Sequence, residues 1–240
     1  MRAEARHQLK QDRFSQTTLE AAERTYQWSA EHKTKLTVVV IVVVVVAATC
    51  SGAWYYLNQQ DQRASLDLNA AIRTLDTPLR QPGTPAQPDF PTFVSPQERA
   101  TAARKQFQAI VSNYPHTRSA DFARYLLGVT EADLGDNASA TRDLETESRY
   151  HNQDIAALAK LALASVYRNE GRAKQAIDLY QGLIARPTNT VSKVMAQMEL
   201  AATYQADGQP LEAKRVYQEV QKENPGEVGQ MASAKLQQLK

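Results

Sequence analysis

The sequence predicts an all-α protein in which a single transmembrane helix near the N-terminus precedes a solenoid of helical hairpins. Between Lys35 and Asp61 the chain has no charged residue, and residues 36–57 are predominantly apolar. Further along, an alanine recurs at intervals of 37, 36 and 37 residues, each time followed four residues later by a large apolar side chain. Such spacing is typical of a repeat array, in which each hairpin buries its apolar face by stacking on its neighbours. The repeated pairs are Ala103 and Phe107, Ala140 and Leu144, Ala176 and Tyr180, and Ala213 and Tyr217.

Three further sets of residues keep the same register and mark the helices of each hairpin. A leucine followed by a small residue precedes each turn, and the small residue allows two helix backbones to approach closely. These pairs are Leu127-Gly128, Leu163-Ala164 and Leu200-Ala201. The first helix then ends at a glycine, which adopts positive φ without steric cost: Gly135, Gly171 and Gly208. A proline, which cannot continue a helix, follows the second helix: Pro115, Pro187 and Pro225.

This order of residues resembles the tetratricopeptide repeat, in which each unit is one helical hairpin. The resemblance covers about residues 96–240 and consists of Leu-small-x-x-Tyr, then Gly, then Ala-x-x-x-aromatic, then Pro. The period of 36–37 residues exceeds the roughly 34 of that repeat, and no unit has its first-helix tryptophan. The middle unit also has Glu131, Glu147 and Asn152 where an aromatic, a small residue and a proline are expected. A generic helix bundle is the alternative, but an unrelated bundle needs no fixed period.

The apolar segment 36–57 has the length and flanks of a transmembrane helix. As a helix it would span about 33 Å, close to the hydrocarbon thickness of a bilayer. Residues 38–46 are eight valines and one isoleucine, which favour a strand in water, but in lipid a lone segment must close its hydrogen bonds as a helix. The predicted membrane-interface residues are the cations Lys33 and Lys35 at one end and the aromatic belt Trp54, Tyr55 and Tyr56 at the other.

A cleaved signal peptide is the alternative interpretation of this segment. The apolar run is too long for one, and a leader of 35 residues ahead of it is unusual. Ala47-Ala48-Thr49-Cys50 resembles a lipoprotein cleavage box, but the threonine and the long leader fit that box poorly. We therefore expect Cys50, the only cysteine, to be a small side chain in an apolar helix.

Cations near the two ends of the segment predict its orientation. Arg24, Lys33 and Lys35 precede it, and only Arg63 and Arg73 follow it within a similar distance. Since cations are enriched on the cytoplasmic side, we expect the N-terminus in the cytoplasm and the repeats on the far side of the membrane.

The chain divides into five predicted regions. Residues 1–35 form a cytoplasmic tail, in which Thr17 and Glu20 give the capping-box pattern of one helix. The regions that follow are a transmembrane helix at 36–57, an amphipathic helix continuing from the membrane at 58–76, a Pro-rich loop at 77–95, and repeats with a C-terminal capping helix at 96–240. Ser95, followed by Pro96 and Glu98, predicts a helix start after the loop. We expect that helix to pair with 58–76 as a first hairpin; a plain tether is the alternative.

Residues that carry chemistry are scattered. His7, His32, His116 and His151 form no pair at metal-ligand spacing and have no cysteine partner. Asp133 and Asp136 flank the Gly135 turn, where an acidic residue most often caps the next helix. No glycine-rich phosphate loop is present, and 28 basic against 26 acidic residues give no reason to expect nucleic acid. We expect no enzymatic activity, no cofactor and no metal.

The resemblance to tetratricopeptide repeats implies a protein-binding groove on the inner surface of the stack. In that family positions two, five, nine, twelve and thirteen of each unit line the groove. Alignment on the turn glycines places there Phe122, Tyr125, Val129, Leu158, Leu161, Ser165, Arg168, Asn169, Met195, Met198 and Gln205. This lining is apolar and contains methionine, which suits adaptable contact with hydrophobic segments. The alternative is that several of these side chains pack between hairpins.

The order of parts resembles the ancillary subunit of the bacterial Sec translocon. The matching residues are Trp54-Tyr55-Tyr56-Leu57-Asn58, then Arg63-Ala64-Ser65-Leu66, then the repeats, whereas the insertion at 77–95 is a departure. The resemblance implies an adaptor anchored in the bacterial inner membrane, with periplasmic repeats, that contacts the translocon and receives chaperones or emerging clients.

Asn113-Tyr114-Pro115, with Ala120 and Ala123 after it, also resembles the periplasmic cell-division coordinator and outer-membrane-assembly lipoproteins. Two other functions therefore stay open. One is a scaffold for envelope assembly or cell-division complexes. The other is a regulator whose cytoplasmic tail sequesters a signalling protein.

Overall fold

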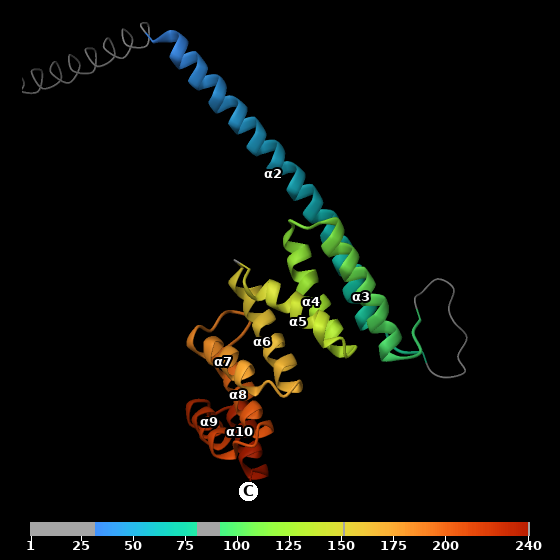
Figure 1. Ribbon diagram of the computed structural model, residues 1–240, viewed down its shortest axis with the longest axis vertical. Helices are drawn as coiled ribbons and strands as arrows, with labels where there is room; N and C mark the ends of the chain where they lie inside the picture. Colours follow the sequence, from blue (N-terminus) through green and yellow to red (C-terminus); the bar gives the residue numbers. More distant parts are fainter. Residues whose placement is uncertain (1–31, 81–91, 151, 240) are drawn as a thin grey trace, which may run out of the picture. The chain divides into compact units, whose positions relative to one another are not determined.

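The computed structural model describes residues 32–80, 92–150 and 152–239, and the secondary-structure elements named in them are α-helices (Figure 1). The predicted all-α class is thereby confirmed. The chain divides into two units, Met1–Tyr56 and Leu57–Lys240. The helix predicted around Thr17 and Glu20 and most of the Pro-rich loop lie outside the described residues.

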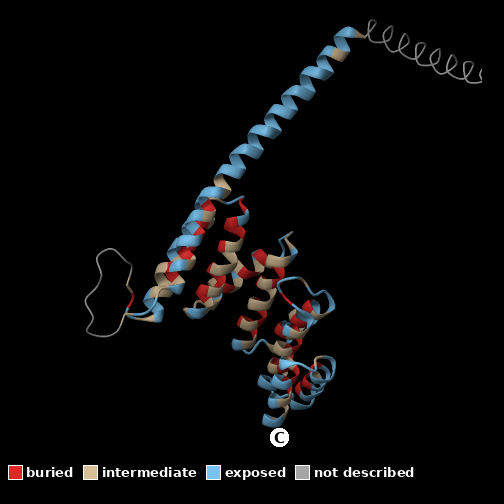
Figure 2. Cartoon of the chain, turned by 180° about the vertical axis from the view of Figure 1, so that it is seen from behind, coloured by how far each residue is buried: buried red, intermediate tan, exposed pale blue. Residues whose placement is uncertain are grey.

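In the first unit the described element is the N-terminal part of helix α2 (Lys33–Asp76). Its side chains from Val38 to Val46 are 54–60 % exposed (Figure 2). The hydroxyls of Thr37 and Thr49 each donate a 2.8 Å hydrogen bond to the carbonyl four residues earlier, so these polar groups are satisfied within the helix. With a mean hydropathy of 2.6 over its apolar window, this stretch is a candidate membrane span or signal anchor.

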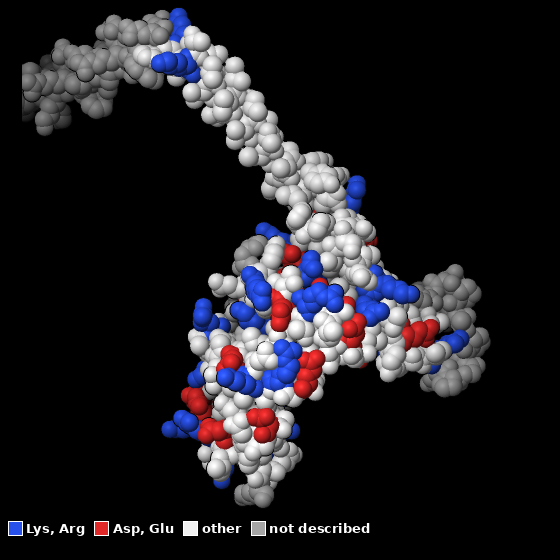
Figure 3. All heavy atoms as spheres, in the orientation of Figure 1, with Lys and Arg blue, Asp and Glu red and all other residues white. Residues whose placement is uncertain are grey.

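The flanks of this stretch keep the pattern expected of a membrane helix. Lys33 and Lys35 are exposed at its start, and Trp54, Tyr55 and Tyr56 are exposed at its end. Between these flanks the helix surface carries no charged side chain (Figure 3). Its apolar surface is therefore free to face lipid.

The second unit is a succession of antiparallel hairpins in which each helix packs against the next. The first helices of consecutive hairpins, α4, α6 and α8, also contact one another. After the end of α2 the helices are α3 (Pro96–Asn113), α4 (Arg118–Asp133), α5 (Asn137–Ser148), α6 (Gln153–Asn169), α7 (Ala173–Ala185), α8 (Lys193–Ala206), α9 (Pro210–Glu223) and α10 (Glu227–Gln238).

The first hairpin joins the C-terminal part of α2 to α3 across the Pro-rich insertion. Ala64, Leu68 and Ala71 share a buried cluster with Phe107 and with other side chains of α3 and α4. At the insertion, the amide of Arg80 donates a 2.8 Å hydrogen bond to the carbonyl of Phe93, so the two strands of chain that leave and re-enter the hairpin are tied together. Ser95 caps α3 by accepting a hydrogen bond from the amide of Glu98.

The repeated alanines and their large apolar followers form the core between hairpins. All four alanines have no exposed surface, and the four followers are at most 1 % exposed. Each side chain is covered because the alanine adds no bulk and lets the neighbouring helix approach. In Figure 2 the buried residues follow the lines where consecutive helices meet.

The three turn glycines have the same conformation. Gly135, Gly171 and Gly208 have φ of 81°, 74° and 72°, in the left-handed region that side chains with a Cβ rarely adopt. In each turn the amide after the glycine donates to a carbonyl five residues earlier, at 2.9, 2.8 and 2.8 Å. This is the Schellman arrangement that satisfies the last carbonyls of a helix.

Gly128 lies where α4 packs closely against α5. A Cβ placed on it would lie 2.7 Å from Cγ and 2.9 Å from Cδ2 of Leu144, which is fully buried. A Cβ placed on Gly182 of α7 would instead meet open space.

We expect Gly128→Ala to lower the free energy of unfolding by about 1–2 kcal/mol, because the added methyl group overpacks the α4–α5 contact. Gly182→Ala is the matched control, and it should raise stability by about 0.5–1 kcal/mol through helix propensity alone. Urea unfolding of the full chain in detergent, followed by circular dichroism, measures both. Equal stabilisation by the two substitutions would show that the hairpins do not pack this closely.

Two buried carboxyl groups distinguish the α4–α5 hairpin. Burial, with further repulsion from Asp143 and Asp136, raises the pKa of Glu131 to about 7. Burial, with the nearby Asp121 carboxylate, also raises the pKa of Glu147 to about 7, although Arg124 lies 3.8 Å from one Glu147 oxygen and opposes the shift. One oxygen of each glutamate has no hydrogen-bond partner among the described residues.

These two groups should make stability depend on pH. Their pKa values in the folded protein exceed those of an unfolded chain, so the folded state binds more protons between about pH 4 and 7. The free energy of unfolding should therefore fall as pH rises from 5.5 to 8, by up to about 2 kcal/mol for each carboxyl group. Urea unfolding at both pH values of the wild type and of a Glu131→Gln/Glu147→Gln variant tests this.

The double variant should lose most of the pH dependence, whereas Glu212→Gln, at an exposed carboxylate on α9, should keep it. A pH dependence that survives in the double variant would assign it to other groups.

Candidate binding groove

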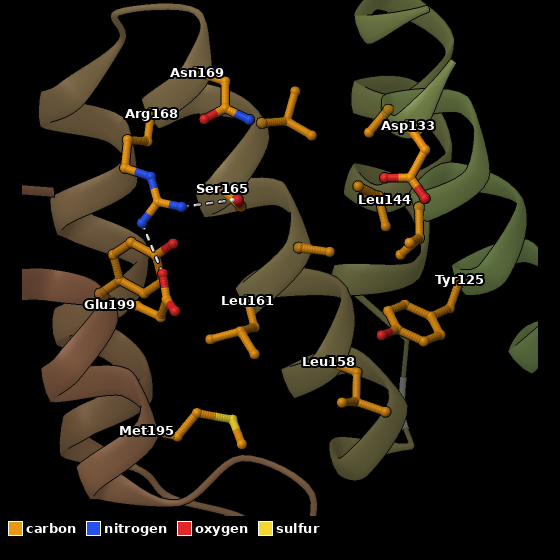
Figure 4. A pocket seen from close by; sticks show the side chains of 15 residues that line it. Tyr125, Asp133, Leu144, Leu158, Leu161, Ser165, Arg168, Asn169, Met195 and Glu199 are labelled. Atoms are coloured by element: carbon orange, nitrogen blue, oxygen red, sulfur yellow. Dashed lines mark hydrogen bonds and ion pairs between the residues drawn. The ribbon is translucent and has the colours of Figure 1, made fainter. Parts of the chain in front are cut away.

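A hollow of about 480 Å³ lies along the first helices of three consecutive hairpins, α4, α6 and α8 (Figure 4). We call it the groove. Leu144 of α5 and Tyr180 of α7, the buried repeat residues of two hairpins, also line it. The stack therefore builds the groove: the second helices supply buried side chains that support it, and the first helices supply its walls.

Eight of the eleven residues predicted at the binding surface line the groove. They are Tyr125, Val129, Leu158, Leu161, Ser165, Arg168, Asn169 and Met195. None of these side chains is fully buried, and Met195 is 44 % exposed. Tyr125, Val129, Leu158 and Leu161 also pack against the core cluster, so they contribute to stability as well as to the surface.

The groove is apolar at one end and polar at the other. Leu158 and Met195 lie near the starts of α6 and α8, at the apolar end in Figure 4. Asp133 and Asn169 are the last residues of α4 and α6, and they lie with Arg168 at the polar end. This polarity follows from the sequence, because parallel first helices place residues of the same register at the same level.

An ion pair joins α6 to α8 in the groove wall. Nη1 of Arg168 lies 2.7 Å from Oε2 of Glu199, and Nη2 donates a 3.3 Å hydrogen bond to Oγ of Ser165. Tyr180 lies near this pair; burial raises its pKa to about 12, so its hydroxyl stays protonated. That hydroxyl is close to Thr203, but it makes no hydrogen bond within the described part of the chain.

Asp133 lies at the polar end without a partner of its own. Its side chain reaches solvent, but the adjacent protein atoms remove part of its hydration and raise its pKa. No hydrogen bond or ion pair to it is present among residues 32–80, 92–150 and 152–239. Asp136, on the other side of the turn, caps α5 by accepting a hydrogen bond from the amide of Ser139. Of the two aspartates, only Asp136 therefore fulfils the capping role expected from the sequence.

Comparison with known proteins identifies the class of this fold. The family model described as a tetratricopeptide repeat-like domain matches residues 26–240. The chain belongs to the tetratricopeptide repeat-like family. No significant match was found among curated proteins or among solved structures. Tetratricopeptide repeat-like domains are typical of adaptors that bind other proteins, and the fold is typically non-catalytic.

The remaining three predicted surface residues lie outside the groove of this tetratricopeptide repeat-like domain. Phe122 packs against the cluster of the first hairpin, and its ring centroid is 5.7 Å from that of Tyr125. Met198 packs against the C-terminal cluster that includes Ala201 and Tyr217. Gln205 is exposed and does not line the groove.

Two charged residues of the groove were absent from the predicted surface. Asp133 occupies position thirteen of its unit, so the family alignment that placed Asn169 would also have found it. Glu199 is four residues after Met195 and shares its helical face, although the family positions do not include it. Within the described residues no group of histidine, cysteine, aspartate and glutamate side chains could hold a metal ion.

Proposed function

We propose that this chain is a membrane-anchored adaptor of the bacterial cell envelope, in which the groove holds segments of other proteins. The observation that carries the proposal is the partly exposed apolar lining of the groove in a chain that also has an exposed, uncharged helix. Leucine, methionine and tyrosine side chains that remain exposed in a concave surface favour an apolar partner. The eight groove residues are the proposed contacts.

The membrane role is supported by the composition and the extent of the chain. Residues 36–57 are proposed to cross the inner membrane, with 1–35 in the cytoplasm and the helices after residue 57 in the periplasm. The family model begins at residue 26 and so includes this apolar segment together with the repeats. An anchor would hold the groove close to partners that are themselves membrane-bound or periplasmic, which raises their effective concentration.

The proposed partners are the Sec translocon and the periplasmic chaperones or clients that gather at it. The resemblance of the segments around Trp54 and Arg63 to the ancillary translocon subunit supports this choice. Emerging clients expose apolar segments before they fold, and the apolar end of the groove has the chemistry to hold such segments.

Affinity capture after crosslinking in the membrane tests the function. We expect translocon subunits or periplasmic chaperones to be recovered with the wild type, and recovery to fall about ten-fold for Leu161→Ser/Met195→Ser, because each lost apolar contact weakens binding. The matched control is Leu211→Ser, which changes an exposed leucine outside the groove and should leave recovery unchanged. Circular dichroism checks that all variants keep their helicity.

Other captured proteins would contradict the proposed partner. Envelope-assembly or division proteins would support a scaffold, and a soluble cytoplasmic regulator bound to residues 1–35 would support the sequestering role.

Cysteine labelling tests the proposed topology. In a Cys50→Ser background, Asn189→Cys should react with a membrane-impermeant maleimide from the periplasmic side, because Asn189 is exposed and uses its backbone amide to bind Asp154. Ser15→Cys in the tail should react only after the inner membrane is opened. Labelling of position 189 from the cytoplasmic side alone would reverse the assignment.

A further inference from the structure

The polar end of the groove has more negative than positive charge. Asp133 of α4 and Glu199 of α8 line the groove with two carboxylates, and Arg168 of α6 contributes one guanidinium, which points toward Glu199 in Figure 4. Arg168 is already engaged, since its Nη1 lies 2.7 Å from Oε2 of Glu199. The carboxylate of Asp133 is therefore left without a cation.

The helix ends add to this negative potential. The α4 helix ends at Asp133 and α6 ends at Asn169, so two helix C-termini lie at the polar end. A helix C-terminus carries a partial negative charge, which makes a nearby cation favourable and a nearby anion unfavourable. A carboxylate of a partner would therefore be repelled from the end of the groove at which an ammonium or guanidinium group would be attracted.

A short extended peptide segment is long enough to reach from one end of the groove to the other. Tyr125 and Asp133 both line it from α4, and eight residues of helix cover about 12 Å. An extended segment covers that length in three to four residues, at about 3.3 Å for each.

We propose that the groove selects an extended segment in which apolar side chains are followed or preceded, three to four residues away, by a lysine or arginine. The apolar side chains occupy the end formed by Leu158, Leu161 and Met195, and the cation pairs with Asp133. This inference deepens the proposed function and rests on it, because it requires that the groove bind peptides at all. Segments with an acidic residue at the same place are disfavoured, so charge complementarity supplies the specificity and the apolar lining supplies the area.

Fluorescence anisotropy with the full chain in detergent tests the proposal. The labelled probe is the end-capped peptide Gly-Leu-Leu-Ala-Ser-Lys-Gly or its reverse, whichever binds more tightly, and its matched counterparts have glutamate or glutamine in place of lysine. We expect the lysine peptide to bind about five-fold more tightly than the glutamate peptide. Asp133→Asn should remove this preference. The control Asp178→Asn, at an exposed aspartate of α7 outside the groove, should retain it.

The remaining outcomes separate the two proposals. Equal binding of the lysine, glutamine and glutamate peptides, or a preference that survives in Asp133→Asn, would overturn the charge selection and leave peptide binding by the groove in place. Failure of all three peptides to bind would overturn peptide holding by the groove, and the selection inference with it.

Discussion

The whole stack depends on small residues that give large ones room. Ala103, Ala140, Ala176 and Ala213 are fully buried, and so are the large side chains four residues after them. An alanine contributes little apolar area of its own, but it permits the next helix to lie close enough to cover its larger neighbour. At Gly128 the neighbouring helix lies so close that even a methyl group would crowd Leu144. The four hairpins therefore rely on the same clearance.

The groove is the part of the helix surface that packing between hairpins does not bury. The faces of α5 and α7 that carry the repeated residues are turned toward their neighbours, and Leu144 and Tyr180 end beneath the groove. The first helices contact one another only along narrow lines, so part of each apolar face stays exposed. The Arg168–Glu199 pair adds a polar link between α6 and α8 on this open side.

Repeated features of this chain could be predicted from the sequence, and contacts particular to one pair of helices could not. The buried alanines and the left-handed glycines follow from local periodicity, because each unit repeats the same backbone requirement. Met195 and Met198 show the limit: they are three residues apart, yet one lines the groove and the other packs toward α9 and α10. Their separation depends on how the terminal hairpin closes, which spacing within α8 does not encode. The proximity of Tyr180 to Glu199 likewise arises only when two hairpins stack.

The hydrogen bond between Arg80 and Phe93 bears on how well the chain tolerates changes in the sequence of the insertion. It closes the base of the insertion, and the side chain of Arg99 reinforces that base by donating a 2.8 Å hydrogen bond to the carbonyl of Thr77. The entropic cost of closing a loop grows only slowly with its length. Because hydrogen bonds join the two ends of the insertion, the stability of the first hairpin should depend little on the length of the segment between them. Related chains are thus free to diverge in this segment, and a reporter sequence or epitope tag has a permissive point of entry there.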